Sequence, residues 1–291
     1  MKEKEISVKR VVWINTAAII AAVFLAIILH AVVPGSGDLN EAEFDSAFVH
    51  LLGFAPVAVS YFVILFLHCV IVMRCFGNRA SLPGMQIGFR FGIVFAALYM
   101  VGMQEVVVEA SPFNEWGAGF VNFQLYMGIS DALPALLLCL GVAYFTLSSK
   151  NTPGTRQVLT PAEKIKAVSL VTVTFFTARA IGYETGILAS NVNTFPVPAY
   201  LWTAVFGLVL GVCYTVLYPV FAGGRNKSLL SFKLAVLTIG MNWMLFNSFI
   251  GLIFSETMSG MLLRSGLDTA VFFGTAIIIQ RYVLIKNKRA V

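Results

Sequence analysis

The sequence predicts an all-α, polytopic membrane bundle of about eight transmembrane helices. Three observations support this prediction: 58% of the 291 residues are hydrophobic, only 12% are charged, and the mean hydropathy is +0.85. A soluble domain has a smaller apolar share and a larger charged share than this. The apolar residues also form continuous runs of about 20, the helix length that crosses about 30 Å of hydrocarbon.

Eight apolar runs divide the chain, and segments rich in Gly, Pro, Asn and Ser separate them as turns. Helices are favoured over a barrel because the runs are continuous rather than alternating, and because a helix satisfies its own backbone hydrogen bonds in lipid. The first run is long for the core of a signal peptide, so we expect it to remain as a span. The predicted spans are 11–33, 50–74, 88–109, 122–147, 166–190, 199–221, 233–255 and 265–285.

Lys and Arg residues in the loops and at the ends of the runs fall almost entirely on one side of the predicted membrane. Since these residues resist translocation, that side is predicted to be cytoplasmic, and eight spans then place both termini there. We expect a multi-pass protein of the plasma (inner) membrane. The opposite side holds Arg264 and several carboxylates. The basic side holds Lys2, Lys4, Lys9, Arg10, Arg74, Arg79, Arg90, Lys150, Arg156, Lys164, Lys166, Arg225, Lys227, Lys233, Lys286, Lys288 and Arg289.

The two halves of the chain resemble each other, which predicts a tandem repeat of four plus four helices. The halves are 1–150 and 151–291, within one integral membrane domain. Each half has an even number of spans, so the two copies would share one orientation and be related by an axis along the membrane normal. Chance similarity of apolar segments is the alternative. The alignment places Gly128 on Gly266, Ser130–Asp131 on Asp268–Thr269, and Gln104–Glu105 on Asn247–Ser248.

Ionisable and amide side chains inside the spans are the candidate functional residues. Each charge near a helix centre costs about 2.5–3.5 kcal/mol on insertion, so a compensating interaction is expected. By the predicted topology, the carboxylates lie in the outer half of the membrane, and Arg179 lies near the middle of its helix. The candidate substrate- or proton-binding residues are Glu105, Asp131, Arg179, Glu109, Glu184, Asp268, Gln104 and Asn247.

Two interpretations of these charges remain open at this point. In the first, they converge on an acidic cavity that opens outward, with Arg179 at its floor as a counter-ion or as a site for an anionic group. In the second, each charge is satisfied separately, with Arg264 and Asp268 paired across one helical turn. Gln104 and Asn247 serve as ligands in the first interpretation and as interhelical hydrogen-bonding groups in the second.

Three functions are compatible with these patterns. The favoured one is a secondary transporter or translocator of a small solute or a lipid precursor. The alternatives are a non-transporting subunit, assembly factor or sensor, and an enzyme that modifies lipid or quinone at the outer leaflet with the same carboxylates. We expect no catalytic set, metal or cofactor, because the sequence contains no recognised motif for them. Expected partners are membrane lipids and the unknown solute or lipid, with a second copy or a membrane subunit possible, and no nucleic acid.

Overall fold

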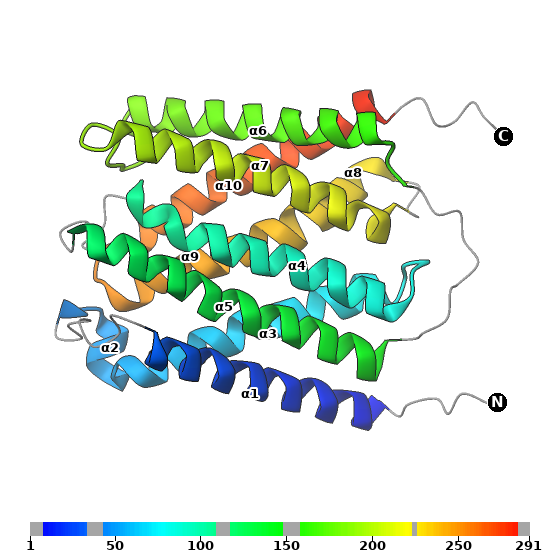
Figure 1. Cartoon of the computed structure of the whole chain (residues 1–291), viewed down its shortest axis with the longest axis horizontal. Coiled ribbons are helices and arrows are strands. Elements are labelled where there is room, and N and C mark those ends of the chain that lie inside the picture. The colour runs from blue at the N-terminus through cyan, green and yellow to red at the C-terminus, as the bar shows by residue number, and fades with distance from the viewer. Residues whose placement is uncertain (1–7, 34–42, 109–116, 148–157, 223–225, 285–291) are drawn as a thin grey trace.

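The computed structural model of the chain describes residues 8–33, 43–108, 117–147, 158–222 and 226–284. These residues form helices and turns, with no strand among them. Eight of the helices are long and apolar enough to cross a membrane, which confirms the prediction of an all-α chain with eight apolar spans. Figure 1 shows the eight lying side by side as one bundle.

The first six spans are each built around one main helix, and the last two contain π-helical segments. Two short helices and a 3₁₀ turn also appear. The elements of the first half are α1 (Val8–Val32), α2 (Ala47–Leu52), α3 (Phe54–Gly77), α4 (Gly84–Gly102), the 3₁₀ turn η3 (Met103–Val107) and α5 (Gly117–Thr146). Those of the second half are α6 (Pro161–Glu184), α7 (Pro196–Phe221), α8 (Lys227–Ser231), the π-helix η5 (Phe232–Gly240), α9 (Met241–Ile253), α10 (Met258–Ile278) and the π-helix η6 (Ile279–Val283).

The start of α6 illustrates how local sequence fixes a helix end. Thr160 is the N-cap, and its hydroxyl accepts a hydrogen bond from the backbone N–H of Glu163 at 3.2 Å. The Glu163 carboxylate accepts the backbone N–H of Thr160 at 2.8 Å. Pro161 occupies the first helical position, where its missing N–H removes no helical bond. This reciprocal capping box starts the helix five residues before the predicted 166.

The last span also begins earlier than predicted. Its helix starts at Met258, seven residues before the predicted 265. Ser259 and Arg264 lower the hydropathy of this stretch, and for that reason it resembles a loop in the sequence. In the structure Arg264 is 2% exposed and lies inside the helix.

Contacts between the spans define a closed order of neighbours around the bundle. Starting from α1, the order is α1, α5, α4, α7, α6, α10, α9, α3 and back to α1. In Figure 1, α6, α7, α4, α5 and α1 follow one another from top to bottom. Helix pairs that are distant in sequence, such as α1 with α5 and α6 with α10, are therefore direct neighbours.

Two glycine pairs allow close helix contacts. Gly88 of α4 lies against α5, where an added Cβ would be 2.8 Å from the backbone oxygen of Cys139. Gly211 of α7 lies against α6, where an added Cβ would be 2.8 Å from the Cα of Val168. Both glycines belong to GxxxG sequences, with Gly92 and Gly207, and this spacing favours close approach of helix backbones.

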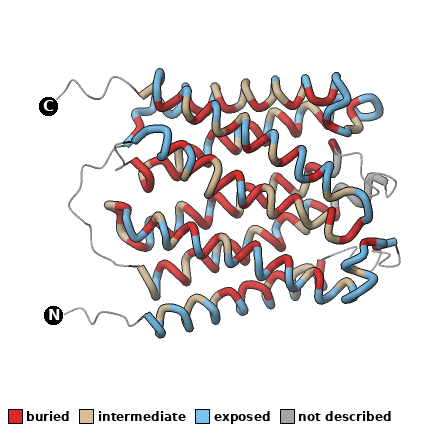
Figure 2. The backbone as a smooth tube through the Cα atoms, turned by 180° about the vertical axis from the view of Figure 1, so that it is seen from behind, coloured by how far each residue is buried: buried red, intermediate tan, exposed pale blue. Residues whose placement is uncertain are grey.

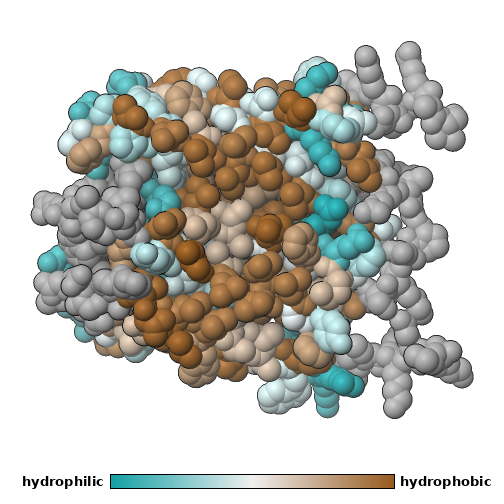
Figure 3. Space-filling view, viewed as in Figure 1, coloured by the Kyte–Doolittle hydropathy of each residue, from teal (hydrophilic) through white to brown (hydrophobic). Residues whose placement is uncertain are grey.

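The surface of the bundle carries an apolar belt. Figure 2 shows buried residues on the sides of the helices that face their neighbours and exposed residues on the outer sides. Trp13, Phe24 and Ile28 of α1 are 75%, 62% and 56% exposed. Figure 3 shows hydrophobic side chains across the middle of the face, with hydrophilic ones toward the two ends. This distribution fits a chain whose outer surface contacts lipid.

One end of the bundle holds α2, the α6–α7 turn and the α9–α10 turn, and we name it the α2 end. Here the segment before α2 is tied to the α9–α10 turn. The Asp45 carboxylate accepts hydrogen bonds from the backbone N–H and the hydroxyl of Ser255, at 2.8 and 2.5 Å. These bonds lower the pKa of Asp45 below its ordinary value of 3.8. The contact joins two segments that are 210 residues apart.

Asp45→Asn is expected to lower the thermal unfolding midpoint at neutral pH, because an amide accepts these two bonds less strongly than a carboxylate. The folded-state pKa is depressed, so the stabilisation is complete above pH 3.8 and is lost as the pH falls through the folded-state value. The difference in midpoint between wild type and variant should therefore shrink in acid. Thermal unfolding in detergent micelles across this range is the measurement. If the difference in unfolding midpoint stays constant as the pH falls through the folded-state pKa of Asp45, this role of Asp45 is contradicted.

Candidate functional site

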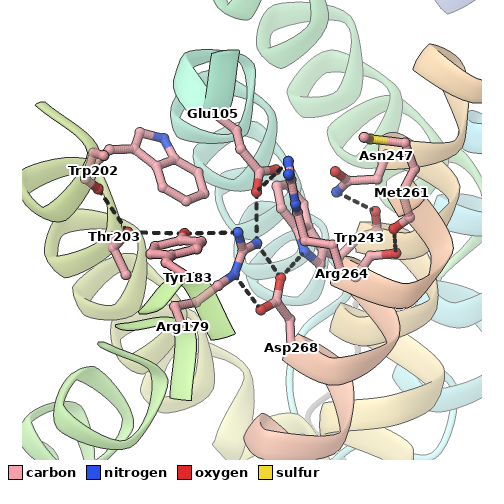
Figure 4. Close-up of polar contacts among 12 residues, drawn as sticks. Glu105, Arg179, Tyr183, Trp202, Thr203, Trp243, Asn247, Met261, Arg264 and Asp268 are labelled. Carbon is pink, nitrogen blue, oxygen red and sulfur yellow. Dashed lines mark hydrogen bonds and ion pairs between the residues drawn. The ribbon is translucent and has the colours of Figure 1, made fainter. Parts of the chain in front are cut away.

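Four charged side chains meet in the interior near the α2 end. Arg179 comes from α6, Glu105 from η3, and Arg264 and Asp268 from α10. Each of the four residues is at most 4% exposed. Figure 4 shows them pointing toward one another from three separate spans. We name these four residues the charge cluster.

Arg179 and Asp268 form the tightest contact in the cluster. The Nε of Arg179 donates to Oδ1 of Asp268 at 2.7 Å, and its Nη2 donates to Oδ2 at 2.5 Å. This two-point geometry is the arrangement that a guanidinium makes best with a carboxylate. Trp243 of α9 adds a third bond, since its indole N–H donates to Oδ2 of Asp268 at 2.9 Å.

The remaining faces of the Arg179 guanidinium are also occupied. Its Nη1 donates to the hydroxyl of Tyr183 at 3.1 Å, one turn along α6. The Phe175 and Trp202 rings lie 5.4 and 5.5 Å from its central carbon, within the range of cation–π attraction. Aromatic rings and hydrogen bonds therefore hold this cation in one orientation.

Glu105 connects the first half of the chain to this site. It lies in the 3₁₀ turn that ends the third span, and its Oε1 is 2.7 Å from Nη2 of Arg179. The same oxygen is 3.7 Å from Nη1 of Arg264. Arg264 also donates from Nη2 to the backbone oxygen of Ala189, in the α6–α7 turn, at 2.6 Å.

The formal charges of the cluster cancel, because two arginines face two carboxylates. A buried charge without a partner costs several kcal/mol, and close pairing with hydrogen bonds offsets that cost. In α6, Arg179 lies five residues before the last residue, Glu184. That distance is about 7.5 Å along the helix axis, so the cluster lies nearer the α2 end than the predicted mid-span position.

A pocket of about 320 Å³ reaches the cluster between α6 and α10. Arg179 and Asp268 are the charged residues that line it, and the remaining lining is apolar. Ile181, Ile187 and Leu267 border it and are 56%, 57% and 39% exposed on the outer surface of the bundle. The pocket therefore connects the Arg179–Asp268 pair to the apolar surface. The complete lining is Ala178, Arg179, Ile181, Gly182, Ile187, Leu188, Leu267, Asp268 and Val271.

The structure brings three of the eight candidate residues together, namely Glu105, Arg179 and Asp268. Asp131 of α5 lies instead beside α1, with its Oδ1 3.4 Å from Nε2 of His30. Glu184 is exposed, and its carboxylate accepts a hydrogen bond from the hydroxyl of Tyr200 at 2.5 Å.

The two candidate amides are not members of the charge cluster. Asn247 of α9 donates to the backbone oxygen of Trp243 at 3.1 Å, which is an intrahelical bond. The buried amide nitrogen of Gln104 has no hydrogen-bond partner among the described residues. Glu109 lies outside the described residues. Fewer of the candidate residues therefore come together in the charge cluster than the sequence analysis proposed.

Arg264, Trp243 and Tyr183 contribute to the site without having been candidates. A signal for Arg264 exists in the sequence, since it precedes Asp268 by four residues and therefore shares its helix face. Tyr183 gives the same kind of signal, since it follows Arg179 by four residues on α6. Trp243 gives no such signal, because only the packing of α9 against α10 brings it to Asp268. Among the described residues, no group of three or more His, Cys, Asp or Glu side chains could hold a metal ion.

Comparisons of the chain with family models, with curated proteins and with solved structures found no match. The geometry of the site is therefore the basis for its interpretation.

Proposed function

We propose that the protein is a membrane transporter or translocator that binds the anionic group of a small solute or a lipid precursor at Arg179. The supporting observation is that a pocket with apolar walls leads to a buried arginine. A volume of about 320 Å³ is at the small end of ligand sites, which span about 300–1,000 Å³. Such a pocket fits a compact acidic group, while an attached apolar chain would remain among Ile181, Ile187 and Leu267.

Exchange of partners at Arg179 is the proposed mechanism. A phosphate or carboxylate group of the substrate matches the guanidinium fork in the same way as Asp268 does. When the substrate takes this place, Asp268 keeps the Trp243 N–H, and a proton taken up on its carboxyl group would cancel the charge that the substrate brings. Release of the substrate restores the bidentate pair. Binding is in this way linked to proton uptake.

The tandem repeat remains a proposal, and the neighbour order of the helices supports it. In a four-plus-four repeat the counterparts are α1 and α6, α3 and α7, α4 and α9, and α5 and α10. Exchanging every helix with its counterpart leaves the closed order α1, α5, α4, α7, α6, α10, α9, α3 unchanged. The charged contacts follow this relation as well. In each half the first span faces the fourth through a pair of ionisable side chains, His30 with Asp131 and Arg179 with Asp268. Two such halves could move against each other during transport.

The orientation and the membrane also remain proposals. The basic residues outside the spans favour cytoplasmic termini in a plasma (inner) membrane. Both the start of α1 and the end of η6 lie at the end of the bundle opposite the α2 end (Figure 1). The charge cluster and its pocket would then lie in the outer half of the membrane.

A second candidate function is a non-transporting membrane subunit, assembly factor or sensor. The observation that favours it is the complete pairing of Arg179 by Asp268, Glu105 and Tyr183. In this candidate the cluster only holds the third span, α6 and α10 together, and a partner subunit or a second copy carries out the function. The two candidates differ in whether an anion can displace Asp268.

Flux through purified protein in phosphatidylcholine vesicles tests the proposal. The lipid probe is phosphatidate with a fluorescent acyl chain, and its exposure to a membrane-impermeant quencher reports translocation. The solute probe is radiolabelled glycerol phosphate. We expect at least one probe to move at least ten-fold faster than in empty vesicles, and the probe that moves identifies the source of the anionic group.

The variants separate transport from stability. Arg179→Gln combined with Asp268→Asn removes both charges of the pair, keeps the pocket neutral and should abolish the accelerated flux. Arg74→Gln, near the opposite end of the bundle, should leave it unchanged. If neither probe moves faster than in empty vesicles, or if the double variant retains full flux, the proposed function is wrong.

A further inference from the structure

His30 of α1 and Asp131 of α5 form a second buried polar contact, away from the charge cluster. Nε2 of His30 lies 3.4 Å from Oδ1 of Asp131. Asp131 is fully buried, whereas the His30 side chain is 18% exposed. His30 lies two residues before the end of α1 at Val32, in the half of the span nearer the α2 end. The contact thus joins a partly accessible imidazole to an inaccessible carboxyl group.

The other nitrogen of the imidazole fixes where its proton lies. Nδ1 of His30 is 2.8 Å from the backbone oxygen of Ala26, one turn earlier in the same helix. A carbonyl oxygen can only accept a hydrogen bond, so Nδ1 must carry a hydrogen. In a neutral imidazole the second nitrogen then presents a lone pair. This lone pair would face the oxygen of Asp131.

A lone pair facing a buried carboxylate is repulsive unless a proton lies between the two groups. Neither carboxyl oxygen of Asp131 has a hydrogen-bond partner among the described residues. An ionised carboxylate in that position would carry a large desolvation cost. The cost is removed if the pair contains one additional proton, either on Nε2 of His30 or on the carboxyl group.

The described neighbouring groups have other partners or no titratable proton, so the additional proton belongs to His30 and Asp131. Tyr61 of α3 also faces Asp131, but its hydroxyl donates to the backbone oxygen of Phe246 at 3.4 Å. The Phe62 ring covers the imidazole, with the ring centres 5.4 Å apart. From η3, which packs against α5, Glu105 faces Arg179 instead.

We infer that His30 and Asp131 together form a proton-binding site that exchanges with water at the α2 end. The proton comes from water and returns to it, and only the N–H or O–H bond at the pair forms and breaks. The accessible imidazole is the entrance, and the carboxyl group is the buried partner. Because the two groups are in contact, they bind and release this proton as one unit rather than as two independent groups.

Nuclear magnetic resonance of the full-length protein in lipid nanodiscs tests the site. The chain has three histidines, His30, His50 and His68, and four aspartates, Asp38, Asp45, Asp131 and Asp268. Labelling the histidine rings with ¹⁵N and the aspartate carboxyl carbons with ¹³C therefore gives few signals. His30→Gln and Asp131→Asn assign the pair, and His50→Gln, at an exposed position on α2, is the matched control.

Near neutral pH we expect one of two spectra. Either both nitrogens of His30 are protonated beside an ionised Asp131, or only Nδ1 is protonated beside a protonated Asp131. On raising the pH, the signals of both residues should change in a single step as one proton leaves. Asp131→Asn should abolish this joint step, and His50→Gln should leave it intact.

Two results would overturn the inference, and both come from the wild-type protein, so they do not depend on variants that fold. One is a neutral His30 ring of either tautomer beside an ionised Asp131 near neutral pH. The other is titration of the two residues in separate steps. Neither result bears on flux through the Arg179 pocket, so this test is independent of the proposed function.

Discussion

Arg179→Met is expected to lower the free energy of unfolding by about 3–5 kcal/mol, the usual cost of removing one partner from a buried ion pair. The substitution keeps an unbranched side chain but removes the guanidinium, and among the described residues it leaves Asp268 with the hydrogen bond from the Trp243 N–H (Figure 4). Among the described residues, Glu105 would keep an ion pair with Arg264 alone, at 3.7 Å. Reversible unfolding in mixed micelles of detergent and dodecyl sulfate is the measurement.

The double variant Arg179→Met with Asp268→Asn should be more stable than Arg179→Met alone, because it leaves one arginine facing one carboxylate. We expect it to recover about 1–3 kcal/mol of the loss. Arg74→Met serves as the control for removing an arginine elsewhere, and should cost less than about 1 kcal/mol. If the second substitution adds to the loss instead of reducing it, Asp268 is not stabilised by Arg179.

Trp243→Ala is expected to lower the free energy of unfolding by about 3–5 kcal/mol, the typical cost of truncating a large buried aromatic residue. Trp243 is 2% exposed, and its ring centre lies 4.4 Å from that of Phe206 and 5.7 Å from that of Phe246. Loss of the indole removes this packing together with the hydrogen bond to Asp268. The same micellar unfolding assay gives the value.

Two further tryptophan variants divide this effect. Trp243→Phe keeps an aromatic ring but removes the indole N–H, and should cost about 1.5–3 kcal/mol, the value of a hydrogen bond to a charged group. Trp13→Ala, at a position that is 75% exposed on α1, should change the stability by less than about 1 kcal/mol. A cost for Trp13→Ala equal to that of Trp243→Ala would contradict the assignment of Trp243 to the core of the site.

The spans could be predicted from the sequence because a membrane helix needs length and apolar composition, and both are local properties. Boundaries were predicted less well where polar residues lie inside a helix. Arg264 was assigned to the outer loop because a basic residue at the edge of an apolar run usually marks a boundary. The structure places it inside α10 and beside Glu105, where its charge is balanced.

The membership of the site could be predicted only in part. Glu105, Arg179 and Asp268 were candidates because a charge within an apolar run needs a partner. Which partner each one has depends on the order of helices around the bundle, and no local pattern contains that order. For this reason Asp131 was grouped with Arg179, although α5 packs against α1 and gives it His30 as a neighbour.

Tryptophan fluorescence tests the central claim, the binding of an anionic group at Arg179, most directly. Trp202 and Trp243 lie beside Arg179 and Asp268, and replacing Trp13 and Trp116 by Phe leaves these two as the only tryptophans. We predict that phosphatidate or glycerol phosphate changes their emission in a saturable way. The change should be absent when Arg179→Gln and Asp268→Asn are added. An emission that neither probe alters, or the same change in the variant without the pair, would contradict the claim.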